Sequence, residues 1–260
     1  MSKIIICVAV YDTDQNNRTE YTEATIYSLS ETINTDTTKV VFIDNDSCNK
    51  TKSLLKKASN TYPFHVITNI INVGTAEAIN QAIHQYAKPE DYVVKLDNDV
   101  TFGRSGWADE MKEMIEAFPT IGVLGLKRKD LPNQPISIPY PTVLKFIPHN
   151  LGDKWRVLEV CDDVIGTCHM YNPLLREKVG YLWQQGVYAF DDVLMCARSS
   201  VAGFVNGFYP CVDIEHLDRG ATPYTEWKKR VAGKYLDSIR GIIDSYQDGS
   251  RSIFYNPFPD

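Results

Sequence analysis

The chain has 260 residues, of which 43% are hydrophobic and 23% charged, so its composition is globular and its length allows a substantial core. Its net charge of −6 at pH 7 gives no general attraction to nucleic acid or to anionic membranes. Six scattered cysteines without a Cys-x-x-Cys pair favour reduced thiols and a cytoplasmic location over disulfides or zinc ligands. No stretch approaches the roughly 18–20 apolar residues of a membrane span, so we expect no transmembrane segment.

Short β-branched runs alternate with helical patterns through the first 125 residues. The predicted strands are Ile4–Val10, Lys39–Ile43, His65–Thr68, Tyr92–Leu96 and Ile121–Leu126. The predicted helices are Tyr21–Ile33, Thr51–Ala58, Thr75–Tyr86 and Trp107–Phe118. This alternation is typical of right-handed crossovers and a mostly parallel sheet covered on both faces. Ligands of such sheets bind beyond the carboxyl ends of the strands.

The second half begins with a proline-rich stretch, residues 127–156, which favours a loop or β-hairpin insertion that could act as a flap. Beyond it we predict a strand at Val157–Val160, an apolar run at Val164–Tyr171, a short helix after Pro173, a helix near Asp191–Ala202, a strand at Val205–Val212 and one long helix at Tyr224–Tyr246. The absence of a linker-like segment favours a single domain.

The most informative motif is Asp97-Asn98-Asp99, which directly follows the predicted strand Tyr92–Leu96. Alternate side chains of extended backbone point the same way, so the two carboxylates should converge at the strand end. Hard oxygen ligands suit Mg²⁺ or Mn²⁺, which shares its remaining positions with substrate phosphates. On local grounds a simple acidic turn is equally compatible with this triplet.

Two further motifs follow strands of the first half. Asp44 closes one strand and could accept hydrogen bonds from a nucleobase or a ribose hydroxyl, although a strand-to-helix turn with Asp46 or Ser47 as the N-cap explains the pattern as well. Asn72, Gly74 and Thr75 form the second motif. Gly74 permits a tight turn, and the amides of the helix that begins at Thr75 would favour an anion; an ordinary helix entry is the alternative.

The second half contributes Asp191, Asp192 and His216. Two adjacent carboxylates raise each other's proton affinity, so one can serve as a general base near neutral pH. The alternative is a helix N-terminus, where acidic residues complement the dipole. With a two-aspartate site available, the imidazole of His216 becomes a further ligand, one that suits Mn²⁺ better than Mg²⁺.

Taken in chain order, these motifs resemble the GT-A glycosyltransferases of family 2, inverting enzymes that use nucleoside-diphosphate sugars. The matching stretches are Val8–Tyr11 with Arg18, Ile43–Ser47, Asn72–Asn80, Leu96–Asp99, Ile165–Thr167 before Val179-Gly180, Asp191-Asp192 through Arg198 and Gly203, and His216.

The resemblance implies an α/β GT-A (Rossmann-like) fold, with a mostly parallel central sheet flanked by helices, a smaller acceptor-side β element and a C-terminal helix. The expected single domain, 1–260, divides into a nucleotide-sugar-binding half (1–126), an acceptor and catalytic half (127–220), and a C-terminal helix and tail (221–260).

Site roles also follow from the resemblance. Tyr11 and Asp44 would hold the nucleobase and ribose, and Asp97 would approach the ribose or a metal-bound water. Asp99 and His216 would bind Mn²⁺ or Mg²⁺, and Asp192 would be the catalytic base.

The chain departs from the family at two places. Leu194 stands where the usual signature has another acid, a change that should affect helix packing more than chemistry. The first strand ends in Tyr-Asp-Thr rather than Thr-Tyr-Asn, which changes the base pocket.

Two other functions compete with this interpretation. A nucleotidyltransferase would also use strand-end acids and a metal, but the segment after the first strand lacks the glycine-rich basic loop of that class. A non-catalytic nucleotide-sugar-binding protein would not need the Asp191-Asp192 pair. The expected acceptor is a saccharide, lipid or protein hydroxyl, with a hydroxymethylated DNA base as the minority alternative. The sequence does not indicate the oligomeric state.

Overall fold

The computed structural model describes residues 2–130, 143–148, 155–220 and 223–258. The elements of the first half are β1 (Ile4–Val10), α1 (Thr19–Thr32), β2 (Thr38–Asn45), α2 (Asn49–Thr61), β3 (Phe64–Asn69), α3 (Thr75–Tyr86), β4 (Tyr92–Leu96), β5 (Val100–Phe102), α4 (Trp107–Ala117) and β6 (Ile121–Arg128). Those of the second half are β7 (Val143–Pro148), β8 (Trp155–Val160), β9 (Cys168–Tyr171), α5 (Pro173–Val179), α6 (Asp191–Val201), β10 (Val205–His216), α7 (Pro223–Gly233) and α8 (Leu236–Gln247).

One sheet of ten strands runs through the described residues in the order β3-β2-β1-β4-β9-β6-β10-β8-β7, with β5 paired to β10. Strands β3, β2, β1 and β4 are parallel, as the sequence predicts. Strand β9 lies antiparallel between β4 and β6, and β10 is again parallel to β6. The sheet is therefore parallel through its first four strands, as predicted, and mixed beyond β4.

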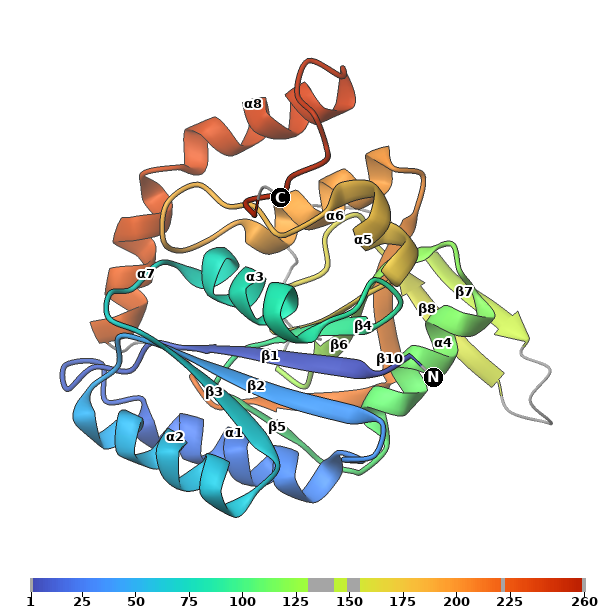
Figure 1. Ribbon diagram of the computed structural model, residues 1–260. Coiled ribbons are helices and arrows are strands. Elements are labelled where there is room, and N and C mark those ends of the chain that lie inside the picture. Colours follow the sequence, from blue (N-terminus) through green and yellow to red (C-terminus); the bar gives the residue numbers. More distant parts are fainter. Residues whose placement is uncertain (1, 131–142, 149–154, 221–222, 259–260) are drawn as a thin grey trace.

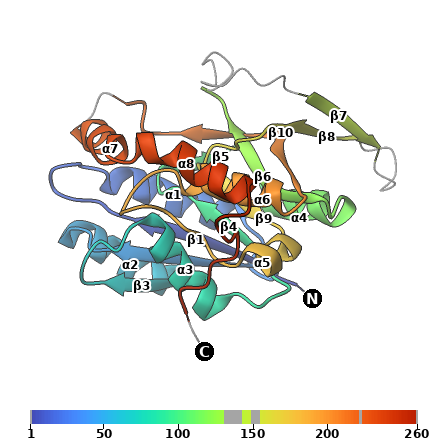
Figure 2. The same cartoon turned by 90° about the horizontal axis from the view of Figure 1, so that it is seen from above.

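Helices cover both faces of the sheet (Figures 1 and 2). Alternation along β1 explains how one strand serves both: Ile4, Ile6 and Val8 belong to the core under α1, α2 and α4, while Ile5 and Cys7 belong to the core under α3, α5 and α6. Within the described residues, no helix is both long and apolar enough to cross a membrane.

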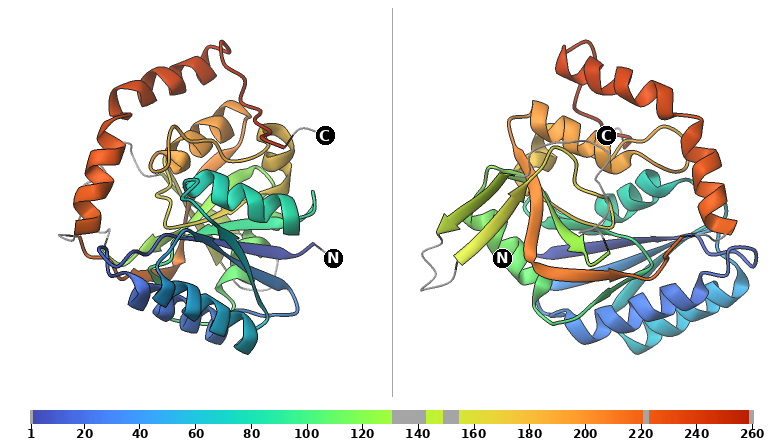
Figure 3. Two further views of the ribbon diagram at one scale, coloured as in Figure 1. Left: turned by 60° about the vertical axis from the view of Figure 1, so that its left-hand side comes forward. Right: turned by 180° about the vertical axis from the view of Figure 1, so that it is seen from behind.

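The predicted long helix Tyr224–Tyr246 is wrong in one respect. Its sequence forms two helices, because α7 ends at Gly233 and the chain turns through Lys234 and Tyr235 before α8 begins. Glycine is a poor helix former, which explains the position of the break. The two helices run in different directions, α7 beside the carboxyl ends of β1–β3 and α8 over α6 (Figures 1 and 3).

The proline-rich stretch contains a β-hairpin-like pair, as predicted: β7 and β8 are antiparallel. The predicted flap falls largely on residues 131–142, outside the described residues.

Candidate active site

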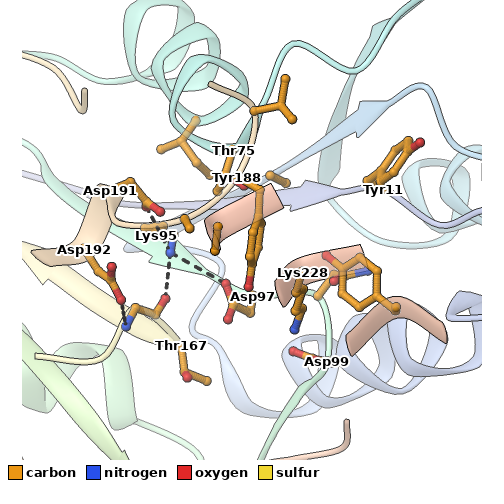
Figure 4. A pocket seen from close by; sticks show the side chains of 18 of the residues that line it. Tyr11, Thr75, Lys95, Asp97, Asp99, Thr167, Tyr188, Asp191, Asp192 and Lys228 are labelled. Carbon is orange, nitrogen blue, oxygen red and sulfur yellow. Dashed lines mark hydrogen bonds and ion pairs between the residues drawn. The ribbon is translucent and has the colours of Figure 1, made fainter. Parts of the chain in front are cut away.

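A cavity of about 510 Å³ opens at the carboxyl ends of β1 and β4, between α7 and the segment that precedes α6. Figure 4 shows it from close by. Seven of the nine predicted site residues line it: Tyr11, Asn72, Asp97, Asp99, Asp191, Asp192 and His216. Motifs from both halves of the chain therefore meet in one cavity. The other two, Asp44 and Gly74, lie behind its wall.

At one end of the cavity Asp97 and Asp99 meet His216. Asp97–Asp99 form the turn between β4 and β5 rather than an extension of the strand. The turn arises because β5 pairs antiparallel with β10, which places Val100 opposite His216. A ligand atom of each of the three side chains lies within 4.8 Å of the other two. The predicted convergence is present, through a turn instead of alternation along a strand.

This triad fits a divalent cation by chemistry and by its contacts. Two carboxylates and an imidazole are a suitable donor set for Mn²⁺. Asp99 Oδ1 and His216 Nδ1 are buried and have no hydrogen-bond partner among the described residues, which is costly unless another group satisfies them. Asp97 faces the cavity with a side chain that is 38% exposed, so it can turn toward a cation or a substrate.

The two aspartates differ in charge environment. Burial opposes ionisation of Asp99, but the hydrogen bond from His216 and the charge of Arg18 outweigh it and hold the Asp99 pKa below its ordinary value. Burial raises the pKa of Asp97; Lys95 opposes this rise and Asp99 adds to it.

Arg18 has a larger part in the site than its motif suggests. Its buried guanidinium lies 2.6 Å from Asp99 Oδ2 and 2.6 Å from Asp218 Oδ2, and it packs over the Tyr224 ring at 4.3 Å. It therefore fixes one oxygen of Asp99 and leaves Oδ1 for a ligand.

The other end of the cavity holds Asp191 and Asp192 at the start of α6, as the helix-terminus alternative anticipates. The two residues before them, Ala189 and Phe190, have positive φ angles of 87° and 67°. Strained backbone of this kind is retained where it aims a functional group. Asp192 lines the cavity and its Oδ2 accepts from the Gly166 N–H at 2.9 Å.

Asp44 is placed differently from the prediction. It is 1% exposed, does not line the cavity, and accepts a hydrogen bond from the Ser47 N–H. Alternation along β2 turns Asp44 toward α1 and α2 and sends its neighbour Asn45 into the cavity instead. Ser47 in turn bonds Val10 and Asp12, so Asp44 supports the end of β1 that presents Tyr11.

Gly74 shapes the wall without lining it. Its φ angle of 93° favours glycine, and a β-carbon there would lie 2.8 Å from the Val187 Cα. The Asn72 side chain accepts from the Gly74 N–H and from Asn45. Because Thr75 donates to the Val187 carbonyl, this turn joins α3 to the segment before α6.

Several lining residues are absent from the prediction. Trp227 of α7 stands 5.9 Å from the Tyr11 ring, 5.4 Å from Tyr188 and 5.4 Å from Tyr224. Lys228 lies 3.7 Å from Asp218. In the sequence, Trp227 and Lys228 belong to the amphipathic pattern of Tyr224–Tyr246, and such a pattern indicates a helix packed against the core rather than a binding site.

Residues 6–175, more than half of the chain, match the family model described as glycosyl transferase family 2. No curated protein matches the chain.

Solved structures share the fold at low identity. The mannosyltransferase PcManGT from Pyrobaculum calidifontis, in complex with GDP-Man and Mn²⁺, has a TM-score of 0.65 and 17% identity over 94% of this chain and 69% of its own. S. aureus TarS 1-349 with UDP-GlcNAc has a TM-score of 0.58 and 15% identity over 94% and 70%. GalNAc-T7 with UDP, GalNAc and Mn²⁺ has a TM-score of 0.59 and 11% identity over 83% and 44%.

Proposed function

The chain belongs to glycosyltransferase family 2, and from this premise we propose that it moves a sugar from a nucleoside-diphosphate donor to an acceptor hydroxyl with inversion. One observation carries the proposal: a single cavity has three side chains that could hold a metal ion, Asp97, Asp99 and His216, at one end and the Asp192 carboxylate at the other. A nucleotidyltransferase or a sugar sensor would not need both.

The diphosphate belongs at the triad end. Asp99, His216 and Asp97 would hold Mn²⁺ or Mg²⁺, which supplies electrostatic stabilisation for the departing diphosphate when bound. The Lys228 ammonium, 3.7 Å from Asp218, adds a positive charge at the same end of the cavity. Solved neighbours with this fold include complexes with GDP-Man and Mn²⁺ and with UDP and Mn²⁺, which supports the same arrangement here.

The nucleoside lies beside Tyr11 and Asn72 in this proposal. Tyr11 and Trp227 offer aromatic faces to the base, and the turn at Gly74 brings the start of α3 to the cavity. Asp44 contributes indirectly in this proposal. It accepts a hydrogen bond from the Ser47 N–H, and Ser47 supports the end of β1 that Tyr11 follows.

Asp192 is the proposed base. It takes the proton from the acceptor hydroxyl, the hydroxyl oxygen forms a bond to the anomeric carbon, and the bond between that carbon and the diphosphate oxygen breaks. Attack comes from the face opposite the leaving group, so the configuration inverts. The Gly166 N–H holds one Asp192 oxygen, and each carboxylate oxygen keeps a lone pair for the incoming hydroxyl.

Asp192→Asn tests this assignment. Because the variant removes the proton acceptor and keeps the shape, transfer should fall by about 10²–10⁴-fold. Nucleotide affinity, measured by calorimetry with Mn²⁺, should stay within about twofold of wild type, a change small on the scale of binding energies. Asp162→Asn, at a nearby exposed aspartate, is the matched control. Near-normal turnover by Asp192→Asn contradicts the base assignment.

The donor and acceptor classes are found by one screen. Nucleotide sugars are tested for hydrolysis with Mn²⁺, and the active donor is then offered saccharide, lipid, protein and hydroxymethylated DNA acceptors with detection by mass spectrometry. A salt-sensitive gel shift would favour the DNA base.

A further inference from the structure

Lys95 is a charged residue in the middle of a buried strand. All five residues of β4 are buried, and Lys95 itself is 5% exposed. A buried ammonium is costly unless charged and polar partners compensate it, so its position calls for a reason.

Its partners belong to both ends of the cavity. The Lys95 Nζ lies 3.1 Å from Asp191 Oδ2 and 3.7 Å from Asp97 Oδ1, and it donates to the Gly166 carbonyl at 2.9 Å. Figure 4 shows the ammonium between Asp191 and Asp97. Asp97 belongs to the metal triad, whereas Asp191 adjoins the proposed base.

The same contacts reach Asp192 through one loop residue. Gly166 accepts from Lys95 with its carbonyl and donates its N–H to Asp192 Oδ2 at 2.9 Å. The next residue, Thr167, accepts from the Asp97 N–H at 3.0 Å. A β-carbon at Gly166 would lie 2.7 Å from Lys95 Nζ and 2.9 Å from Asp192 Oδ2, so this packing leaves no room for a side chain.

We propose that Lys95 is a positioning residue whose ammonium serves as a fixed cation between Asp97 and Asp191. It anchors the Gly166 loop against Asp192 and keeps a divalent cation from bridging the two ends of the cavity. The inference rests on the proposed function, because it assigns the two ends to a metal and to a base.

The physical reason lies in the number of carboxylates. The Lys95 Nζ position is within 3.7 Å of oxygens from two aspartates and a carbonyl. A neutral side chain at 95 leaves three oxygen donors around a space of ion size, which is a site for a hard divalent cation. A cation there would draw Asp97 from the triad and occupy the surroundings of the base.

The test counts Mn²⁺ ions. Folded wild-type protein, titrated with Mn²⁺ alone and followed by electron paramagnetic resonance, should bind one ion per chain. Lys95→Met should bind two. Lys95→Gln keeps a hydrogen-bond donor toward Gly166 without the charge, and it should also bind two. Adding Asp191→Asn to Lys95→Gln should return the count to one.

The kinetic readout uses the donor that the hydrolysis screen selects. A misplaced base lowers kcat, and displacements of about 1 Å can cost about 100-fold. At Mn²⁺ concentrations too low to fill the second site, Lys95→Gln should therefore lower kcat by that order with donor KM nearly unchanged. Raising Mn²⁺ should lower its rate further, and wild type should not show this inhibition.

One bound Mn²⁺ in a folded Lys95→Gln protein overturns the inference, as does a second ion that persists after Asp191→Asn is added. If Lys95→Met does not fold, Lys95→Gln decides alone. The ion count needs no turnover, so it is independent of the base assignment. An active Asp192→Asn variant would refute the base assignment of the proposed function and leave the ion count intact. An inactive Asp192→Asn variant beside a Lys95→Gln protein that binds a single ion would refute only the lysine inference.

Discussion

Asp97 and Asp99 are the same residue type two positions apart, and their surroundings separate their roles. Asp99 is 1% exposed, and both the Arg18 guanidinium and the His216 imidazole contact its Oδ2. It is therefore held ionised and in one place. Asp97 is open to the cavity, and its carboxylate forms a longer ion pair, 3.7 Å, with Lys95. We infer that Asp99 is the fixed ligand and Asp97 the adaptable one.

Asp99→Ala should therefore abolish the Mn²⁺-dependent part of nucleotide binding, reducing affinity to the level measured with a chelator. Asp99→Asn, which keeps an acceptor for Arg18, should have the same effect with less loss of stability, since an unpaired buried charge costs about 3–5 kcal/mol. The measurement is calorimetric titration with a nucleoside diphosphate, with and without Mn²⁺. Asp46→Ala, at an exposed aspartate, is the control. Unchanged affinity with Mn²⁺ in both Asp99 variants would exclude the ligand role.

Sequence motifs located the acidic residues of the site because their spacing after apolar runs is local information. Asp44 does not line the cavity, because alternation along β2 turns it away and places Asn45 there instead, and local spacing does not reveal which face of the strand a residue occupies. Its role toward the nucleoside stays a prediction. Lys95 could not be recognised from sequence, since its meaning comes from Asp191, which is 96 positions away but 3.1 Å distant.

At the scale of elements, α7 is the helix whose place at the cavity the sequence did not predict. Periodicity indicated helical structure within Tyr224–Tyr246, but it did not separate α7, which faces the cavity, from α8, which packs on α6. Trp227 of α7 contacts three tyrosines around the cavity, whereas Ile239 and Tyr246 of α8 form a cluster with Leu194 of α6. The presence of Leu194 in that cluster agrees with the packing role expected for it.

Trp227→Ala should weaken nucleotide binding about tenfold, because it removes an aromatic face worth about 1 kcal/mol or more beside Tyr11. The fold should be kept, since α7 lies at the edge of the molecule (Figure 3). Calorimetric affinity and donor KM are the measurements. Tyr27→Ala, at an exposed tyrosine on α1, is the matched aromatic control. An unchanged affinity would remove α7 from the nucleotide site.

At the scale of the whole molecule, long-range pairings decide how the halves of the chain meet. Local patterns predicted β1, β4 and α3 with their observed bounds, but they could not place β9 between β4 and β6 or pair β5 with β10. Arg198 adds a further connection: its buried guanidinium donates to carbonyls of Val179, Tyr181 and Ile253, and so ties the C-terminal segment to α6. The division into 1–126, 127–220 and 221–260 stays a prediction.

His169 gives the molecule a measurable dependence of stability on pH. It lies opposite Lys95 where β9 pairs with β4, it is fully buried against Tyr171, and Asp191 is the nearby acid. Burial, with the positive Lys95, lowers its pKa from 6.5 to about 3. Between these values the unfolded chain binds a proton that the folded protein does not, so stability falls as pH falls below 6.5.

From pH 7.5 to pH 5 this one group should lower the free energy of unfolding by about 2 kcal/mol. Asp163 has the opposite effect on stability. Burial raises its pKa to about 6, so its protonation as pH falls removes the cost of burying a charge and stabilises the folded protein. The prediction therefore concerns the difference between wild type and His169→Phe, which keeps a ring against Tyr171 and removes the titration. Urea unfolding at pH 7.5 and pH 5 should show the wild type losing about 2 kcal/mol more than the variant. Equal losses in the two proteins would mean that His169 titrates in the folded state as it does in the unfolded chain, and that the strand between β4 and β6 is open to protons.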